Sequence, residues 1–128
     1  MSSALKQSEL DPQDIGYISA HGTATERGDI AESQATHQLL GSNIPVSAFK
    51  SFTGHTMGAC GALEAMVAIQ MMNQGWFHGT ANLDNVDPQC AKLDYLTGEG
   101  REIETNYVMS NNFAFGGINT SLIFAKVS

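Results

Sequence analysis

The chain has 128 residues, 42% of them hydrophobic, which is enough for one compact domain spanning residues 1–128. Its formal net charge of −7 argues against nucleic acid as a partner, because the phosphates would be repelled. No apolar run approaches the roughly 20 residues of a membrane span, and the first ten residues lack the pattern of a secretory signal. We therefore expect a cytoplasmic protein without a membrane contact.

The first part of the chain predicts helices alternating with strands. Apolar stretches bounded by turn residues are typical of buried strands, and apolar residues spaced by three or four are typical of helices. Pro12 disfavours helix at the residue before it, and Gly41 suits a helix C-cap. The expected elements are a helix over residues 1–9, a strand over 15–20, a helix over 29–40, a strand over 44–49 and a helix over about 56–73.

The second part predicts extended structure and a hairpin. Residues 76–83 are extended, a short strand is possible over residues 92–96, and strands over 107–115 and 118–127 are joined by Gly116-Gly117, a strong hairpin signal. The order α-β-α-β-α-β-β predicts an α/β fold, with a mostly parallel mixed sheet, helices on its faces and a C-terminal antiparallel hairpin.

Three predicted loops follow the carboxyl ends of strands, where ligands collect in such sheets. These loops are residues 21–23, 50–55 and 111–119. His21 follows an apolar strand at once and could present a ring nitrogen to a pocket; a surface position is the alternative. His55 precedes a helix start, where the positive potential favours a neutral ring that could donate to an oxyanion. A capping or packing role for His55 is equally open.

Lys50 ends a predicted buried strand and needs a carboxylate, because an unpaired buried ammonium is costly. Glu64 lies about two turns into the following helix and can fold back toward it. The pair could support the site or be purely structural.

The remaining candidates are a thiol and a glycine turn. Cys60 lies in a predicted helix among Gly and Ala, which favours a packing role over a nucleophile. Phe115 and Gly116 could supply an aromatic gate and a free backbone N–H for an oxyanion, or form a plain glycine hairpin. No His or Cys spacing indicates a metal site.

Three segments together resemble the C-terminal half of the β-ketoacyl-acyl carrier protein synthases, the elongating condensing enzymes of fatty acid and polyketide synthesis. They are HGTATERGD from His21, KSFTGHTMGACGALEA from Lys50 and SNNFAFGGINTSLIF from Ser110, with NLDNVDP from Asn82 as further support. The resemblance covers nearly the whole chain. It implies a thiolase-like half-domain and a decarboxylative Claisen condensation, in which malonyl-carrier protein loses CO₂ and the carbanion attacks an acyl thioester.

The resemblance also implies roles for individual residues. His21 and His55 would serve decarboxylation and enolate stabilisation, with Lys50 as the active-site lysine and Glu64 as its partner. Phe115 would be the acyl gate, and the backbone beside Gly116 the oxyanion donor. It implies no cofactor and no metal, since substrates ride on the phosphopantetheine of acyl carrier protein, which would be a partner.

The sequence departs from the family pattern at a few positions. Glu26-Arg27 replaces a Pro dipeptide, Ala114 replaces a Gly, Ile118 replaces a Thr, and Phe49 stands where a Thr is common. Ala114 could stiffen the gate loop and Phe49 could alter the pocket wall. These departures indicate a divergent subgroup.

The family's nucleophilic cysteine lies in its N-terminal half, which has no match here, and Cys60 is no substitute. We expect a strand to be missing from the middle of the half-sheet, so that its neighbours pair directly, recruit a partner strand or stay exposed. The chain should then associate with itself or with a missing N-terminal half, and be catalytically incomplete alone. One alternative is a non-catalytic partner or carrier-protein-binding module of a ketosynthase complex. Another is a small Cys-His thioesterase or acyltransferase.

Overall fold

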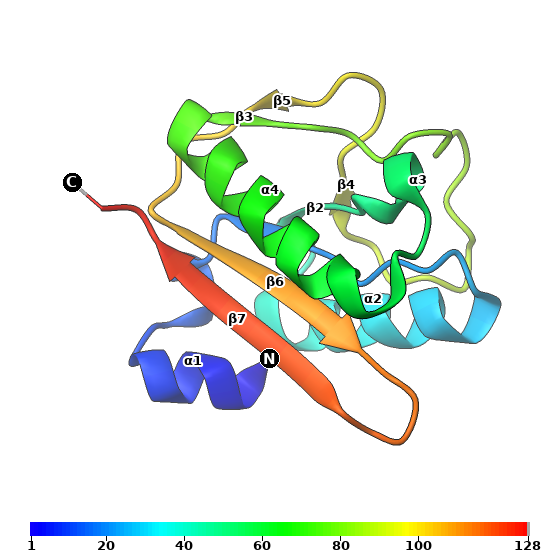
Figure 1. The fold of residues 1–128 in the computed structure, drawn as a ribbon, viewed down its shortest axis with the longest axis horizontal. Coiled ribbons are helices and arrows are strands. Elements are labelled where there is room, and N and C mark those ends of the chain that lie inside the picture. The colour runs from blue at the N-terminus through cyan, green and yellow to red at the C-terminus, as the bar shows by residue number, and fades with distance from the viewer. Residues whose placement is uncertain (128) are drawn as a thin grey trace.

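The computed structural model describes residues 1–127, which form a five-stranded sheet with helices on both faces and a separate two-stranded sheet (Figure 1). The helices are α1 (Ser2–Ser8), η1 (Pro12–Asp14), α2 (Glu26–Leu40), α3 (Lys50–Thr53), η2 (Met57–Ala59) and α4 (Cys60–Gln74), where η marks a 3₁₀ turn. The strands are β1 (Tyr17–Ser19), β2 (Pro45–Ser47), β3 (Trp76–Phe77), β4 (Asp94–Tyr95), β5 (Arg101–Glu102), β6 (Tyr107–Phe113) and β7 (Asn119–Ala125).

The main sheet has the strand order β4-β2-β1-β6-β7. Its first four strands are parallel, and β7 runs antiparallel to β6. Gly116 and Gly117 join β6 to β7 with φ of 82° and 81°, a left-handed conformation that glycine adopts at little cost. The expected α/β class, parallel sheet and C-terminal hairpin are therefore confirmed.

Successive side chains along the strands point to opposite faces of the sheet and pack into two hydrophobic cores. Ile18 and Met109 pack toward α1 and α2, in a cluster that includes Leu5. Tyr17 and Val108, one residue earlier on the same strands, pack under α4, as expected from the period-two alternation of strands. The helices thus form a layer on each face of the sheet (Figure 1). No helix within residues 1–127 is both long and apolar enough to cross a membrane.

Several predicted boundaries differ from the structure. The strand expected over 44–49 ends at Ser47, and Lys50 begins the short helix α3. Gly54, with φ of 67°, ends that helix, and a 3₁₀ turn precedes α4, so the helix expected from residue 56 starts at Cys60. The predicted missing strand leaves no gap within residues 1–127, because β1 pairs directly with both β2 and β6, which is the first of the three expected outcomes. The two outer edges of this sheet, which no described strand covers, belong to β4 and β7.

Gly100 fixes the approach of β5 to β3, and its replacement by alanine is expected to be strongly destabilising. Its φ is 100°, and an added Cβ would overlap the carbonyl oxygen of Phe77. We expect Gly100→Ala to lower the free energy of unfolding by at least about 3 kcal/mol. Gly98→Ala is the matched control, since Gly98 also has a positive φ but open space around it, and should cost only about 1 kcal/mol. Urea unfolding of both variants measures the difference, and equal losses would contradict the overlap.

Candidate active site

The loops after β1 and α3 bring two histidines together. The imidazole rings of His21 and His55 lie edge to face, with centroids 5.6 Å apart and an interplanar angle of 86°. The ring of Phe113, from the end of β6, lies edge to face against His21 at 5.9 Å. All three line a cavity of about 1250 Å³ that opens to solvent. The sequence-based expectation that these sheet-end loops share one cavity agrees with this geometry.

The backbone of the His21 loop is held in a tight conformation. Gly22 has a φ of 45°, and an added Cβ would lie 2.5 Å from the Cβ of Ala48, so only glycine fits there. The carboxylate of Glu32 on α2 accepts the N–H of His21 at 2.8 Å and that of Gly22 at 2.9 Å. Sequence reasoning missed Glu32, although it lies on the helix that directly follows this loop.

Lys50 is buried, and its ammonium has a full set of acceptors. It donates to Glu64 Oε1, to the carbonyl oxygen of His21 at 2.6 Å and to His21 Nδ1 at 3.2 Å. An ammonium has three donors, so each is used within this group. The predicted pairing of Lys50 with Glu64 across one loop and two turns of helix is confirmed as an ion pair with both side chains buried.

Asn112 on β6 completes the buried polar group. Its Nδ2 donates to Glu64 Oε2 at 3.0 Å, and its Oδ1 accepts the thiol of Cys60 at 3.4 Å. Both oxygens of Glu64 are therefore satisfied. The prediction for this segment concerned only the loop glycines and aromatic rings. An asparagine in a strand whose preceding residues are fully buried is the signal that could have identified it.

The hydrogen bonds assign the ring protons. Nδ1 of His21 faces the Lys50 ammonium, and Nδ1 of His55 accepts the backbone N–H of Met57 at 3.0 Å. Each neutral ring then carries its proton on Nε2. Burial lowers the pKa of His21 below its usual value, and the charge of Lys50 lowers it further. His21 is therefore neutral at pH 7 and presents an N–H donor rather than a cation.

Phe115 and Gly116 lie at the tip of the β6–β7 hairpin. The ring of Phe115 is fully exposed, yet the residue lines the same cavity as His21 and His55. The backbone N–H groups of Phe115 and Gly116 meet no acceptor within residues 1–127. Two backbone N–H groups are thus without a protein acceptor at the place where the sequence predicted an oxyanion donor. Phe49, expected at the pocket wall, packs instead against Phe52 and His78 and does not line the cavity.

Neither thiol is hydrogen-bonded to the histidine pair. Cys60 is buried as the first residue of α4, and its thiol donates to Asn112 rather than to an imidazole. A Cβ added at Gly61 would lie 3.5 Å from Nδ2 of Asn112, so this part of α4 lies close to β6. Cys90 is partly buried in a different cavity.

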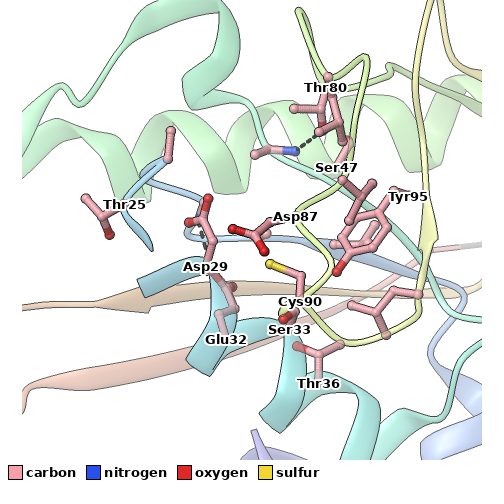
Figure 2. Close-up of a pocket in the computed structure, with 18 of the residues that line it drawn as sticks. Thr25, Asp29, Glu32, Ser33, Thr36, Ser47, Thr80, Asp87, Cys90 and Tyr95 are labelled. Atoms are coloured by element: carbon pink, nitrogen blue, oxygen red, sulfur yellow. Dashed lines mark hydrogen bonds between the residues drawn. The ribbon is translucent and has the colours of Figure 1, made fainter. Parts of the chain in front are cut away.

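That second cavity, of about 320 Å³, lies behind the His21 loop, between α2 and the loop of residues 80–95 (Figure 2). Its polar side chains include Asp29 and Glu32 from α2, Asp87 and Cys90 from the loop, and Tyr95 from β4 (Figure 2). Asp29 and Glu32 line both cavities. The α2 carboxylates therefore separate the second cavity from the histidine pair.

Comparison with known proteins shows which family this chain resembles. Residues 1–84 match the model of the β-ketoacyl synthase C-terminal domain. The 3-oxoacyl-[acyl-carrier-protein] synthase 2 of Synechocystis sp. is 43% identical over 96% of this chain and 30% of its own length. The crystal structure of a β-ketoacyl synthase from Burkholderia phymatum is 58% identical, with a TM-score of 0.99 over all of this chain and 31% of that one.

A third relative comes from a solved complex. It is described as a type II PKS acyl-carrier protein in complex with its ketosynthase bound to the hexaketide; the matched chain is 32% identical, with a TM-score of 0.93 over 98% of this chain and 31% of that one. This chain thus spans about 30% of the length of the relatives it matches. Their structures confirm the predicted thiolase-like fold.

Proposed function

This chain belongs to the β-ketoacyl synthase family, and we propose that it forms the C-terminal part of a 3-oxoacyl-acyl carrier protein synthase. In that enzyme it would supply the decarboxylating side of the active site, in fatty acid or polyketide synthesis. The observation that carries the proposal is the edge-to-face pair of His21 and His55, anchored through His21 to the buried Lys50–Glu64 pair.

The proposed chemistry uses the two imidazole N–H groups as donors. They would bind the thioester oxygen of malonyl-carrier protein as the bond to the carboxylate breaks, CO₂ leaves and an enolate forms. The enolate carbon would then attack the carbonyl carbon of the acyl group, and the thiolate that carried it would leave. Two neutral donors on one oxygen stabilise the charge where it develops without adding a permanent cation.

The nucleophilic thiol would come from polypeptide outside this chain. Cys60 is buried and bonded to Asn112, which supports its structural role, and Cys90, the other thiol among residues 1–127, lies in the second cavity. The free N–H groups at Phe115 and Gly116 would bind the oxyanion of the acyl thioester, with the exposed Phe115 ring as the gate. No cofactor beyond the phosphopantetheine of the carrier protein is needed for these steps.

Acyl carrier protein and a second polypeptide are the proposed partners. The matched ketosynthase from the carrier-protein complex supports the first. With a net charge of −7, this chain is a poor electrostatic match for an acidic carrier protein, so the docking surface would lie mainly on the other polypeptide. A homo-oligomer is the alternative assembly.

The test is reconstitution. The 128-residue chain incubated with malonyl- and acyl-carrier protein should yield neither 3-oxoacyl product nor an acyl adduct on Cys60, both read by mass spectrometry. The same chain joined to the N-terminal part of a related 3-oxoacyl-carrier protein synthase, which carries the nucleophilic cysteine, should form product. An acyl adduct on Cys60 would overturn the proposal. Carrier-protein binding without turnover in the joined form would favour a non-catalytic partner.

A further inference from the structure

Glu32 closes one side of a backbone clamp on His21. Its side chain, only 8% exposed, reaches from α2 and gives one carboxylate oxygen to the N–H of His21 and the other to the N–H of Gly22. On the opposite side, Lys50 donates to the carbonyl oxygen of His21. The main chain that carries the imidazole is thus held at its N–H by α2 and at its C=O by α3.

The two N–H donors of the turn need two acceptor oxygens, and only an ionised carboxylate offers both. Two N–H donors point at the same side chain, and a carboxylate offers an acceptor oxygen to each of them. A protonated carboxyl group or an amide has one full acceptor oxygen, and its second polar atom carries hydrogen. One N–H would then lose its partner, in a place where unpaired buried donors are costly.

We propose that Glu32 is a positioning residue of the active site, whose ionised carboxylate holds the His21-Gly22 turn and thereby fixes the imidazole of His21 against that of His55. This inference rests on the proposed function, because it takes His21 as the group that meets the substrate. Glu32 lines the second cavity (Figure 2) as well as the histidine cavity. Its carboxylate bonds the backbone of the His21-Gly22 turn and not the imidazole, so it acts through the backbone.

The left-handed Gly22 explains why the turn needs such a hold. Its φ of 45° and close approach to Ala48 place the loop in a conformation with little room. A loop residue released at its N–H can rotate about its own φ, which swings the Cβ and the ring. A shift of about 1 Å in a donor that binds a developing charge weakens it strongly.

The charged and titratable groups around Glu32 make this hold dependent on pH. Burial raises the pKa of Glu32 to about 7, and the charge of Asp29 on the same helix adds to the rise. The backbone N–H groups and Lys50 oppose it. His21 faces it from the β1 loop, and Tyr95 and Cys90 face the same cavity from β4 and the loop before it. The clamp should therefore weaken as pH falls below about 7.

Stability should change in the opposite direction. The folded-state pKa of Glu32 lies above its ordinary value of 4.5, so the stabilisation from the protonated form is complete below about 4.5 and is lost as pH rises through about 7. Keeping the carboxylate ionised thus costs stability while it completes the clamp.

Amide hydrogen exchange of His21 and Gly22 tests the inference on the 128-residue chain by NMR. One of the two amides loses its acceptor when Glu32 is protonated. We expect the protection factor of that amide to rise by about tenfold between pH 5.5 and 8, the equivalent of one recovered hydrogen bond of about 1.4 kcal/mol. In Glu32→Gln, which carries a single acceptor oxygen at every pH, protection should be low and flat. Glu26→Gln, an exposed change on the same helix, should behave as the parent does.

Unchanged protection in Glu32→Gln, or flat protection in the parent, would overturn the inference. If Glu32→Gln does not fold, Glu32→Asp replaces it in the test, because aspartate keeps the charge but is too short to reach both N–H groups. Normal amide protection in Glu32→Asp would also overturn the inference. Exchange reports the backbone directly and needs no turnover. A failed condensation assay would therefore count against the proposed function and leave the positioning result standing.

Discussion

Replacing Glu64 with alanine is expected to lower the free energy of unfolding by about 3–5 kcal/mol, among the largest stability effects that a single change in this chain should produce. The carboxylate is 1% exposed and accepts bonds from Lys50 and Asn112. Without it, the Lys50 ammonium stays buried with no counter-charge, and Asn112 loses an acceptor. Urea unfolding followed by circular dichroism measures the loss.

Two further variants test whether the loss in Glu64→Ala comes from the buried, uncompensated charge or from a general sensitivity of the fold to substitution. The ion pair of Arg101 with Asp94 is partly exposed, so Asp94→Ala should cost no more than about 1 kcal/mol. The double variant Lys50→Met with Glu64→Leu removes both charges and should recover most of the stability lost in Glu64→Ala. If the double variant is as unstable as the single one, the hydrogen bonds lost at Asn112 and at the carbonyl oxygen of His21, rather than the uncompensated charge, are responsible.

The site residues that could be predicted from the sequence are those whose positions follow from the order of the strands and helices. His21 and His55 follow β1 and α3 on loops at one edge of a parallel sheet, so the rule for strand ends was enough to bring them together. Lys50 and Glu64 were paired because a buried ammonium requires a carboxylate within reach. These inferences need only the order of the elements and the cost of burying charge.

The contributions that were missed depend on side chains meeting across the fold. Glu32 and Asn112 reach the site from α2 and β6, 11 and 48 positions away from the residues that they bond. A helical pattern shows which face is buried but not which backbone N–H it meets. The short helix α3 was missed for a similar reason, because tertiary contacts override the local preference of four residues.

The open side of the cavity supports the proposed need for a second polypeptide. Met57, Phe115 and Leu122 line the cavity and are largely exposed, and Ile118 is exposed beside them on the hairpin. Apolar side chains gathered around a functional cavity are typical of a surface that another polypeptide covers. Covering it would exclude water from the histidine pair and strengthen the hydrogen bonds to an enolate.

In the joined enzyme, His21→Ala and His55→Ala should each reduce the release of CO₂ from malonyl-carrier protein by about 100- to 1000-fold. The two rings lie 5.6 Å apart and line one cavity, and under the proposed function each would donate an N–H to the same developing oxyanion. The double variant should then fall little below the worse single variant, because one donor cannot replace the geometry made by two. Radiolabelled CO₂ release measures the step independently of condensation.

Cys60→Ser provides the matched control for these losses. Cys60 lines the same cavity but is buried and bonded to Asn112, so a hydroxyl in its place should leave CO₂ release within about threefold of the parent. A loss in Cys60→Ser as large as that in His55→Ala would show that the cavity shape, and not the imidazole donors, controls the rate. Full CO₂ release in His21→Ala would remove this residue from the chemistry, and the clamp formed by Glu32 and Lys50 would then serve the fold alone.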